Sequence, residues 1–210
     1  MELLKFNSLL PFQFGKKSVN YKDHYQLNHL RQYANVFYYK KHLGFATDNI
    51  IKNNQVTFNS LFPYASVNKL KKRYGKPLYH VDHYHGKNHI EILYFKRMIS
   101  DQKVRLEYHF CEGQLFYYNY TFPYLVKHEK DNLFKNIEEK YNLIYKDIID
   151  NCIVDENSIA MSASDRLDLK IAYLNTKSKF FKYLNNRFDK NKNTGSAKGT
   201  SKFSQIYNLL

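Results

Sequence analysis

Polar and apolar residues alternate without interruption in the segment KVRLEYHF, residues 103–110. Successive side chains of a strand point to opposite faces of a sheet, so this segment predicts a strand with one buried face and one face in water. Comparable segments predict strands at 78–85, 89–97 and 114–122, joined by short polar or glycine-containing turns. We therefore expect a four-stranded antiparallel meander.

A short helix is predicted directly before this meander, at residues 66–74. Val67, Leu70 and Tyr74 recur at the spacing of one helical face. Ser66 can cap the helix, because its hydroxyl can accept a hydrogen bond from a free N–H of the first turn. Gly75 suits the left-handed position that often follows a helix end.

Helical spacing returns after residue 123, where apolar residues recur between charged ones. The expected elements are a helix at 127–150, extended segments at 152–154 and 158–162, a strand at 167–173, an amphipathic helix at 177–188, and a polar, flexible tail from 189.

An internal repeat is predicted in the first half of the chain, because FNSLLPF at 6–12 returns as FNSLFPY at 58–64. The alternative is chance similarity in a biased composition. If the repeat is real, the first copy aligns residues 30–41 with the strand at 90–97, although a short helix starting at Asn28 also fits. Short strands are then expected at 45–51 and 55–62.

The expected fold class is α+β, with tandem antiparallel β-meander units that each carry a short helix, followed by a helix–β-hairpin–helix part. The corresponding divisions are a first repeat unit at 1–62, a second at 63–125, a possible degenerate third unit at 126–188, and a flexible basic tail at 189–210.

The chain is strongly basic, with a net charge of +14 over 210 residues. Such a charge attracts nucleic acid or another anionic surface. The alternative is coding bias, since Lys, Asn, Tyr and Ile are abundant together. The cationic run Lys69, Lys71, Lys72, Arg73 and Lys76 contains no acid, so it is the candidate nucleic-acid contact, or else the solvated face of a short helix.

Cys111 and Cys152 lie too far apart for a zinc motif, and reduced, buried thiols are expected. Cys111 lies two residues from His109, but an idle cysteine is the preferred interpretation.

No stretch reaches the ~20 apolar residues of a membrane span. Residues 1–6 do not resemble a signal peptide, so a cytoplasmic location is expected.

The densest polar cluster is the segment HVDHYHGKNH, residues 80–89. His80 and Asp82 share one strand face and His83 and His85 the other. A site built from His80, Asp82 and His109 has ligand types that suit zinc. The alternative is that these are exposed strand and turn residues. No cofactor is otherwise expected.

The segment SVNKLKKRYGKP at 66–77, followed by LYF at 93–95 and FCEGQL at 110–115, resembles units of the β-lactamase-inhibitor-protein-like family, which also occur in small outer-membrane assembly lipoproteins. The resemblance implies a concave sheet that binds a partner rather than a catalytic centre. Those relatives are usually exported, and no export signal is visible here.

Three functions follow as hypotheses. The first is a non-catalytic protein that holds a protein partner on an aromatic sheet face. The candidate contacts are Tyr94, Tyr108, Tyr117, Tyr118 and Tyr120, and half of these are expected to be core instead, because they lie on alternate faces. The second is a basic protein associated with nucleic acid. The third is a metal-dependent enzyme that uses the His/Asp site.

Overall fold

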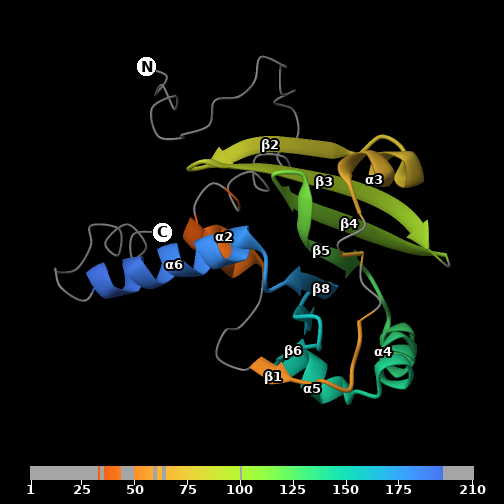
Figure 1. The fold of residues 1–210 in the computed structure, drawn as a ribbon. Coiled ribbons are helices and arrows are strands. Elements are labelled where there is room, and N and C mark those ends of the chain that lie inside the picture. The colour runs from red at the N-terminus through yellow and green to blue at the C-terminus, as the bar shows by residue number, and fades with distance from the viewer. Residues whose placement is uncertain are drawn as a thin grey trace, which may run out of the picture.

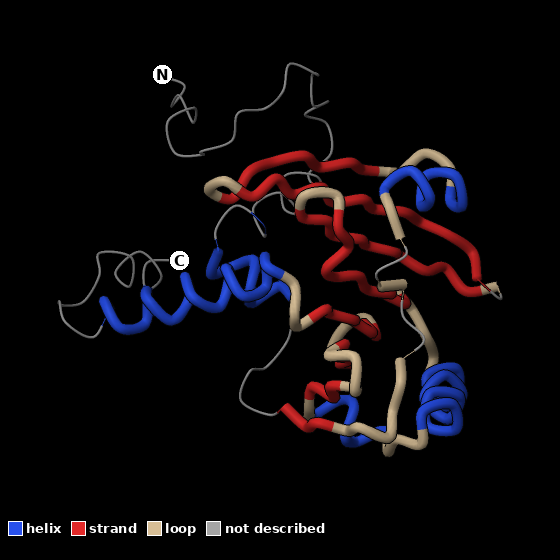
Figure 2. The backbone as a smooth tube through the Cα atoms, in the orientation of Figure 1, coloured by secondary structure: helices blue, strands red, loops and turns tan. Residues whose placement is uncertain are grey.

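The structure, a computed structural model, describes residues 33, 36–43, 50–58, 61–62, 65–99 and 101–195. It confirms the α+β class. Eight strands form one sheet in the order β1-β6-β7-β8-β5-β4-β3-β2, and every neighbouring pair is antiparallel except β1 and β6 (Figure 1). Helices lie on both sides of this twisted sheet (Figure 2).

The predicted meander is confirmed. Its strands are β2 (Tyr79–His85), β3 (Asn88–Ile99), β4 (Gln102–Cys111) and β5 (Gln114–Phe122). The β3–β4 ladder is continuous over ten residue pairs, whereas β4–β5 has a bulge between His109 and Phe110. The bulge changes the direction of β5 near its start, so Phe116 and Tyr117 both contribute to the same core cluster.

The helix before the meander is α3 (Val67–Tyr74), and it ends as predicted. The Ser66 hydroxyl accepts a hydrogen bond from the backbone N–H of Lys69 at 3.3 Å. Gly75 has a φ of 75°, which a residue with a Cβ rarely adopts. Leu70 is buried, and Val67 and Tyr74 pack against the same core.

The C-terminal part contains β6 (Cys152–Val154), β7 (Ile159–Asp165) and β8 (Leu169–Asn175). The helix predicted at 127–150 is wrong as a single element, because left-handed Asn142 divides it into α4 (Lys127–Tyr141) and α5 (Tyr145–Asp150). The last helix, α6 (Lys179–Gly195), continues through the first residues of the predicted flexible tail. No helix in the described ranges is long and apolar enough to span a membrane.

Most of the predicted first repeat unit lies outside the described residues. Where it is described, the strand aligned over 30–41 is wrong, because α2 (Val36–Leu43) is a helix. Residues 55–58 and 61–62 are also not strand. β1 (Ile50–Lys52) pairs with β6, about 100 residues later, instead of joining a meander of its own. The repeat therefore stays a prediction.

The sheet carries a hydrophobic core on each face. One core lies under α3, α4 and α5 and includes Leu93, Leu106 and Tyr118. The other lies under α2 and α6 and includes Tyr39 and Phe180. The expectation that one face of the 103–110 strand lies in water is therefore wrong at Glu107 and His109, which are 5% and 0% exposed.

Replacing Leu106 by alanine tests the first of these cores. Leu106 is completely buried at the centre of the sheet, so we expect Leu106→Ala to lower the free energy of unfolding by about 2–5 kcal/mol. Leu167 is 98% exposed, and Leu167→Ala should change it by less than about 0.5 kcal/mol. Urea denaturation of both variants measures the difference, and equal losses would contradict the assignment of Leu106 to the core.

Candidate functional site

The five tyrosines predicted to meet a partner do not form a surface. Tyr108, Tyr117 and Tyr118 are 0–1% exposed. Tyr94 and Tyr120 are half-buried and lie on opposite faces, because Tyr94 pairs with Glu107 while Tyr120 pairs with Leu106. The three buried residues are wrong as partner contacts, although the expectation that half of the five belong to the core agrees with their burial. Both faces of the sheet are packed, and these rings fill the cores.

The three predicted metal ligands are not brought together. His80 and Asp82 share a strand face, as predicted, and bond Glu91 and His89 across the ladder. The registers place His109 opposite Ile92 and Val81, on the other face of the sheet. Within the described ranges, no three His, Cys, Asp or Glu side chains are grouped so that they could hold a metal ion.

The most extensive polar arrangement is a buried network under α2, centred on Glu107. One oxygen of Glu107 accepts from the hydroxyl of Tyr33 and from Nε2 of His109 at 2.8 Å. Its second oxygen accepts from the Asn119 amide at 2.9 Å. Nδ1 of His109 bonds the hydroxyl of Tyr39 at 2.7 Å. The Glu107 network, as we name this set, ties α2 to β4 and β5.

Two further side chains extend the Glu107 network toward its edge. Nε2 of His42 lies 2.8 Å from the Tyr33 hydroxyl and 3.6 Å from Glu107. Nζ of Lys170 donates to the His42 carbonyl at 3.1 Å and lies 5.6 Å from the centre of the Tyr117 ring. The positive charge of Lys170 therefore lies close to the buried carboxylate.

The electrostatics of the network favour a charged Glu107. Burial acts to raise the pKa of Glu107, but the hydrogen bond and charge of His109, the charge of Lys170 and the Asn119 hydrogen bond outweigh it and lower that pKa to about 2. Burial also lowers the pKa of Lys170, and Glu107 partly offsets this. Both ring nitrogens of His109 are engaged, one with Glu107 and the other with Tyr39 of α2, so the network holds α2 against the sheet.

The thiols do not favour nucleophilic chemistry. Burial raises the pKa of Cys111 to about 11 and that of Cys152 to about 12. A thiol with such a pKa is protonated near pH 7, and the thiolate is the nucleophile. The preferred interpretation of Cys111 as an idle residue therefore agrees with its environment.

Two buried histidines predict how stability depends on pH. Burial lowers the pKa of His83 to about 3 and of His85 to about 4. The unfolded chain binds these protons near pH 6.5 while the folded chain does not. The free energy of unfolding should therefore fall between pH 6.5 and 4, by up to about 1.4 kcal/mol per pH unit for each imidazole.

Urea denaturation at pH 7, 6 and 5 measures this slope. We expect His85→Phe to make the free energy of unfolding depend less steeply on pH, by the contribution of one proton. The variant lacks the imidazole that the unfolded chain protonates. His128 is exposed, and His128→Phe serves as the control. An unchanged slope in His85→Phe would show that His85 does not titrate on unfolding.

The predicted basic run lies on the surface of α3. Lys69, Lys72 and Arg73 are exposed and occupy one side of the helix, opposite the side that carries Leu70 and Tyr74. Lys76 continues the row just beyond the end of the helix, and Lys71 is half-buried beside it. We call Lys69, Lys72, Arg73 and Lys76 the α3 cationic row.

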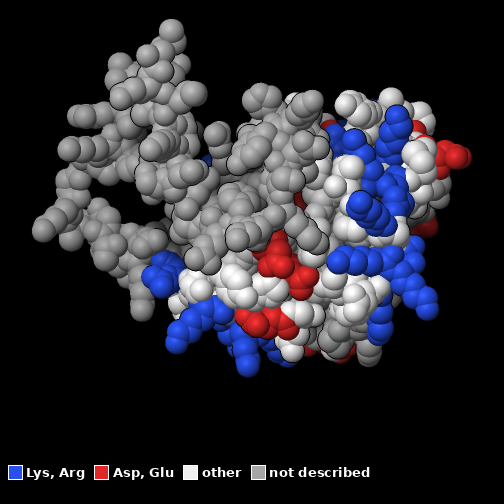
Figure 3. All heavy atoms as spheres, turned by 90° about the horizontal axis from the view of Figure 1, so that it is seen from above, with Lys and Arg blue, Asp and Glu red and all other residues white. Residues whose placement is uncertain are grey.

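The α3 cationic row has few counter-charges. Its helix contains no acidic residue. Among the described residues, no carboxylate is ion-paired with Lys72, Arg73 or Lys76. Arg97 adds a further cation, since its guanidinium lies 3.5 Å from the position of a Cβ built on Gly75. Figure 3 shows Lys and Arg atoms gathered at this end of the molecule, and a separate group toward α6.

Sequence reasoning missed the Glu107 network. It expected Glu107 to face water and did not single out Tyr33, Tyr39, Asn119 or Lys170. The signal in the sequence was the strand alternation, which placed Glu107 and His109 on the same face. Whether water reaches that face depends on α2, and the sequence allowed either a strand or a helix there.

No protein-family model matches this chain, and no curated protein or solved structure matches it either.

Proposed function

We propose that this protein is a non-catalytic binding protein that holds nucleic acid through the α3 cationic row. The observation that carries the proposal is the exposed row of four cations. Three of them lie on the side of α3 opposite its core residues Leu70 and Tyr74, and Lys76 follows just beyond the helix. A phosphate backbone pairs with such a row and releases its condensed counterions.

The dimensions of the row suit a backbone contact. Residues 69 to 73 span about 6 Å along α3, and Lys76 extends the row by two residues beyond the end of the helix. A row of that length can reach two or three phosphates, which positions a nucleic acid without reading its sequence. The burial of Tyr108, Tyr117 and Tyr118 removes most of the surface that the protein-partner hypothesis required.

Fluorescence anisotropy with labelled 20-mer oligonucleotides, single-stranded and duplex, tests this function. We expect binding at 50 mM salt that weakens with a log–log slope of about −2 to −3 as salt increases, from the number of phosphates neutralised. The absence of binding at 50 mM salt, with the protein folded by circular dichroism, would refute the proposal. Binding that does not change with salt would also count against it, because it would exclude a backbone contact.

A further inference from the structure

The second group of cations follows the outer side of α6. The inner side of this helix is apolar, and Phe180, Phe181 and Leu184 are buried in the core that it shares with α2. From residue 177 to 188 the chain has four cations and no carboxylate, and Lys179, Lys182 and Arg187 are all exposed. The outer side is therefore positively charged over its first two and a half turns.

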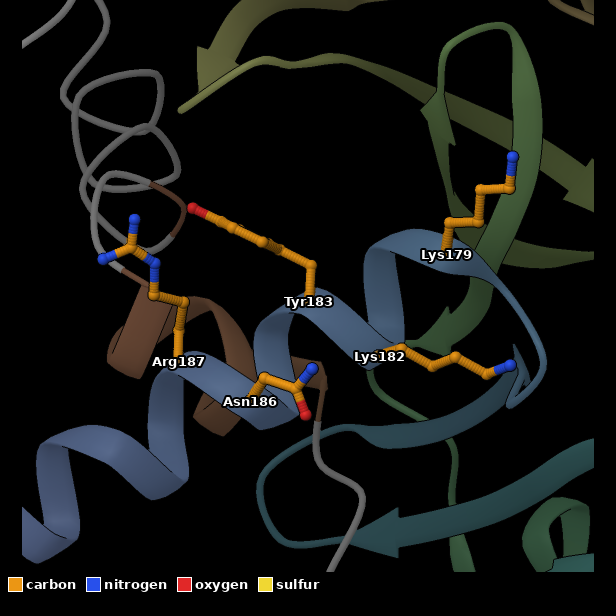
Figure 4. A pocket seen from close by; sticks show the side chains of 5 residues that line it. All are labelled: Lys179, Lys182, Tyr183, Asn186 and Arg187. Carbon is orange, nitrogen blue, oxygen red and sulfur yellow. The ribbon is translucent and has the colours of Figure 1, made fainter.

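This side of α6 borders a hollow of about 420 Å³. Its lining residues are Lys179, Lys182, Tyr183, Asn186 and Arg187, which are shown in Figure 4. The volume is within the range of about 300–1,000 Å³ typical of small-ligand sites, and therefore suits a single nucleotide. The lining combines three cations, one aromatic ring and one amide.

Tyr183 is held in place at this hollow. Its ring stacks on Phe180, with centroids 5.8 Å apart and an angle of 22° between planes. The Arg187 guanidinium lies 5.7 Å from the centre of the Tyr183 ring. The hydroxyl reaches the β2–β3 turn, 3.3 Å from where a Cβ on Gly86 would lie. A side chain held in this way loses little conformational entropy when a ligand binds.

The spacing of the charges matches a strand of nucleotides. Lys179, Tyr183 and Arg187 are four residues apart in turn, so they follow one another along α6 in steps of about 6 Å. In Figure 4 the three side chains rise on the same side of the helix. An aromatic residue between two cations is the pattern by which proteins hold single strands, where the cations meet phosphates and the ring meets an unpaired base.

We infer that the α6 hollow binds one nucleotide of a single-stranded nucleic acid. Lys179 and Arg187 meet the phosphates on either side of it, and its base lies against the edge of Tyr183, where Asn186 can donate to or accept from the base. A duplex keeps its bases paired inside and cannot fill the hollow in this way. The inference depends on the proposed function for the class of ligand, but it concerns a different surface.

Photo-crosslinking combined with anisotropy tests the inference on the full chain. A single-stranded 20-mer containing 5-iodouracil is irradiated with the wild-type protein, and the attached peptide is identified by mass spectrometry. We expect attachment within residues 179–187. We also expect Lys179→Gln/Arg187→Gln to weaken single-strand binding about fivefold or more, with a smaller effect on a duplex of the same sequence.

Two further variants keep the test decisive. Tyr183→Phe retains the ring and its stacking on Phe180, so it should keep the crosslink within 179–187, and loss of the crosslink in this folded variant would count against a base placed at the ring. Lys135→Gln/Lys140→Gln on α4 removes the same charge elsewhere and should leave single-strand affinity within twofold.

Wild-type binding with crosslinks only outside 179–187 and no effect of the α6 double variant would overturn the inference and leave the proposed function intact. Binding that survives loss of the α3 cationic row but not the α6 double variant would support the inference and refute the role of α3. If the wild-type protein binds no oligonucleotide, both the proposed function and the inference about α6 are refuted.

Discussion

Replacing Lys72, Arg73 and Lys76 together by glutamine is expected to weaken nucleic-acid binding about 10- to 100-fold at low salt, because three of the cations that meet phosphates are lost. The log–log salt dependence should become shallower by about 1–2 units, because Lys69 of the row remains. The three side chains are exposed, so the fold should persist. Anisotropy titrations between 50 and 300 mM salt measure both quantities.

The matched control is Lys127→Gln/Lys135→Gln/Lys140→Gln on α4. It changes the net charge equally, but its cations are interspersed with acidic residues, and Lys135 lies 3.8 Å from Glu139. We expect this variant to bind within about twofold of wild type, since distant exposed charges are screened. If both triple variants weaken binding equally, the effect is one of overall charge and the α3 cationic row has no special role.

Replacing Glu107 by alanine is expected to lower the free energy of unfolding by about 3–5 kcal/mol, because breaking a buried charge network leaves its partners unpaired. His109, Tyr33 and Asn119 each lose a hydrogen-bond acceptor. The loss should concentrate at α2, which the network ties to the sheet. Urea denaturation measures the global loss, and amide hydrogen exchange over residues 36–43 measures the local one.

Two comparisons define the outcome for Glu107. His109 and Asn119 bond different oxygens of Glu107, so Glu107→Gln keeps an acceptor for one of them and its loss should be smaller than that of Glu107→Ala. Glu139 is exposed, and Glu139→Ala should cost less than about 0.5 kcal/mol. A loss below about 1 kcal/mol in Glu107→Ala would mean that the network does not hold α2.

The pKa of Glu107 also fixes the direction of a pH effect. Its folded-state pKa of about 2 lies below its ordinary value of 4.5. The stabilisation from its charged form is therefore complete above about pH 4.5 and is lost as pH falls toward 2. As the pH falls, the wild-type protein should first lose stability from His83 and His85, beginning near pH 6.5, and then from Glu107 below about pH 4.5. Glu107→Gln should lack this second decrease in the free energy of unfolding.

Local signals in the sequence were sufficient for α3 and for β2 to β5. The Ser66 cap, the Gly75 end and the faultless alternation at 103–110 all concern neighbouring residues, and local chemistry decides them. The pattern at 30–41 was ambiguous because positions 33, 37 and 39 share one face of a strand, whereas positions 33, 36 and 39 lie on one side of a helix. In the structure residues 36–43 form α2, and Tyr33 and Tyr39 bond Glu107 and His109 on the sheet.

The candidate sites also divide into those that neighbouring residues define and those that only tertiary contacts define. The α3 cationic row could be identified from the run of lysines and the helical spacing alone. For the tyrosine surface, alternation predicted that half of the candidates belong to the core, but it could not show that helices cover both faces of the sheet. The Glu107 network and the α6 hollow need residues far apart in the chain, and no periodicity records those contacts.

By itself, the sequence determined α3, the strands of the meander and where the exposed positive charge of α3 lies, because these follow from residues within one or two turns of each other. In the C-terminal part it located the helical and extended segments but not the break at Asn142 or the end of α6. Only the tertiary structure decided that β1 completes the sheet beside β6, that α2 and α6 cover the face expected to be wet, and that Glu107 is buried among its partners. Those outcomes depend on which surfaces meet, and the burial of apolar area between distant segments, rather than local preference, selects them.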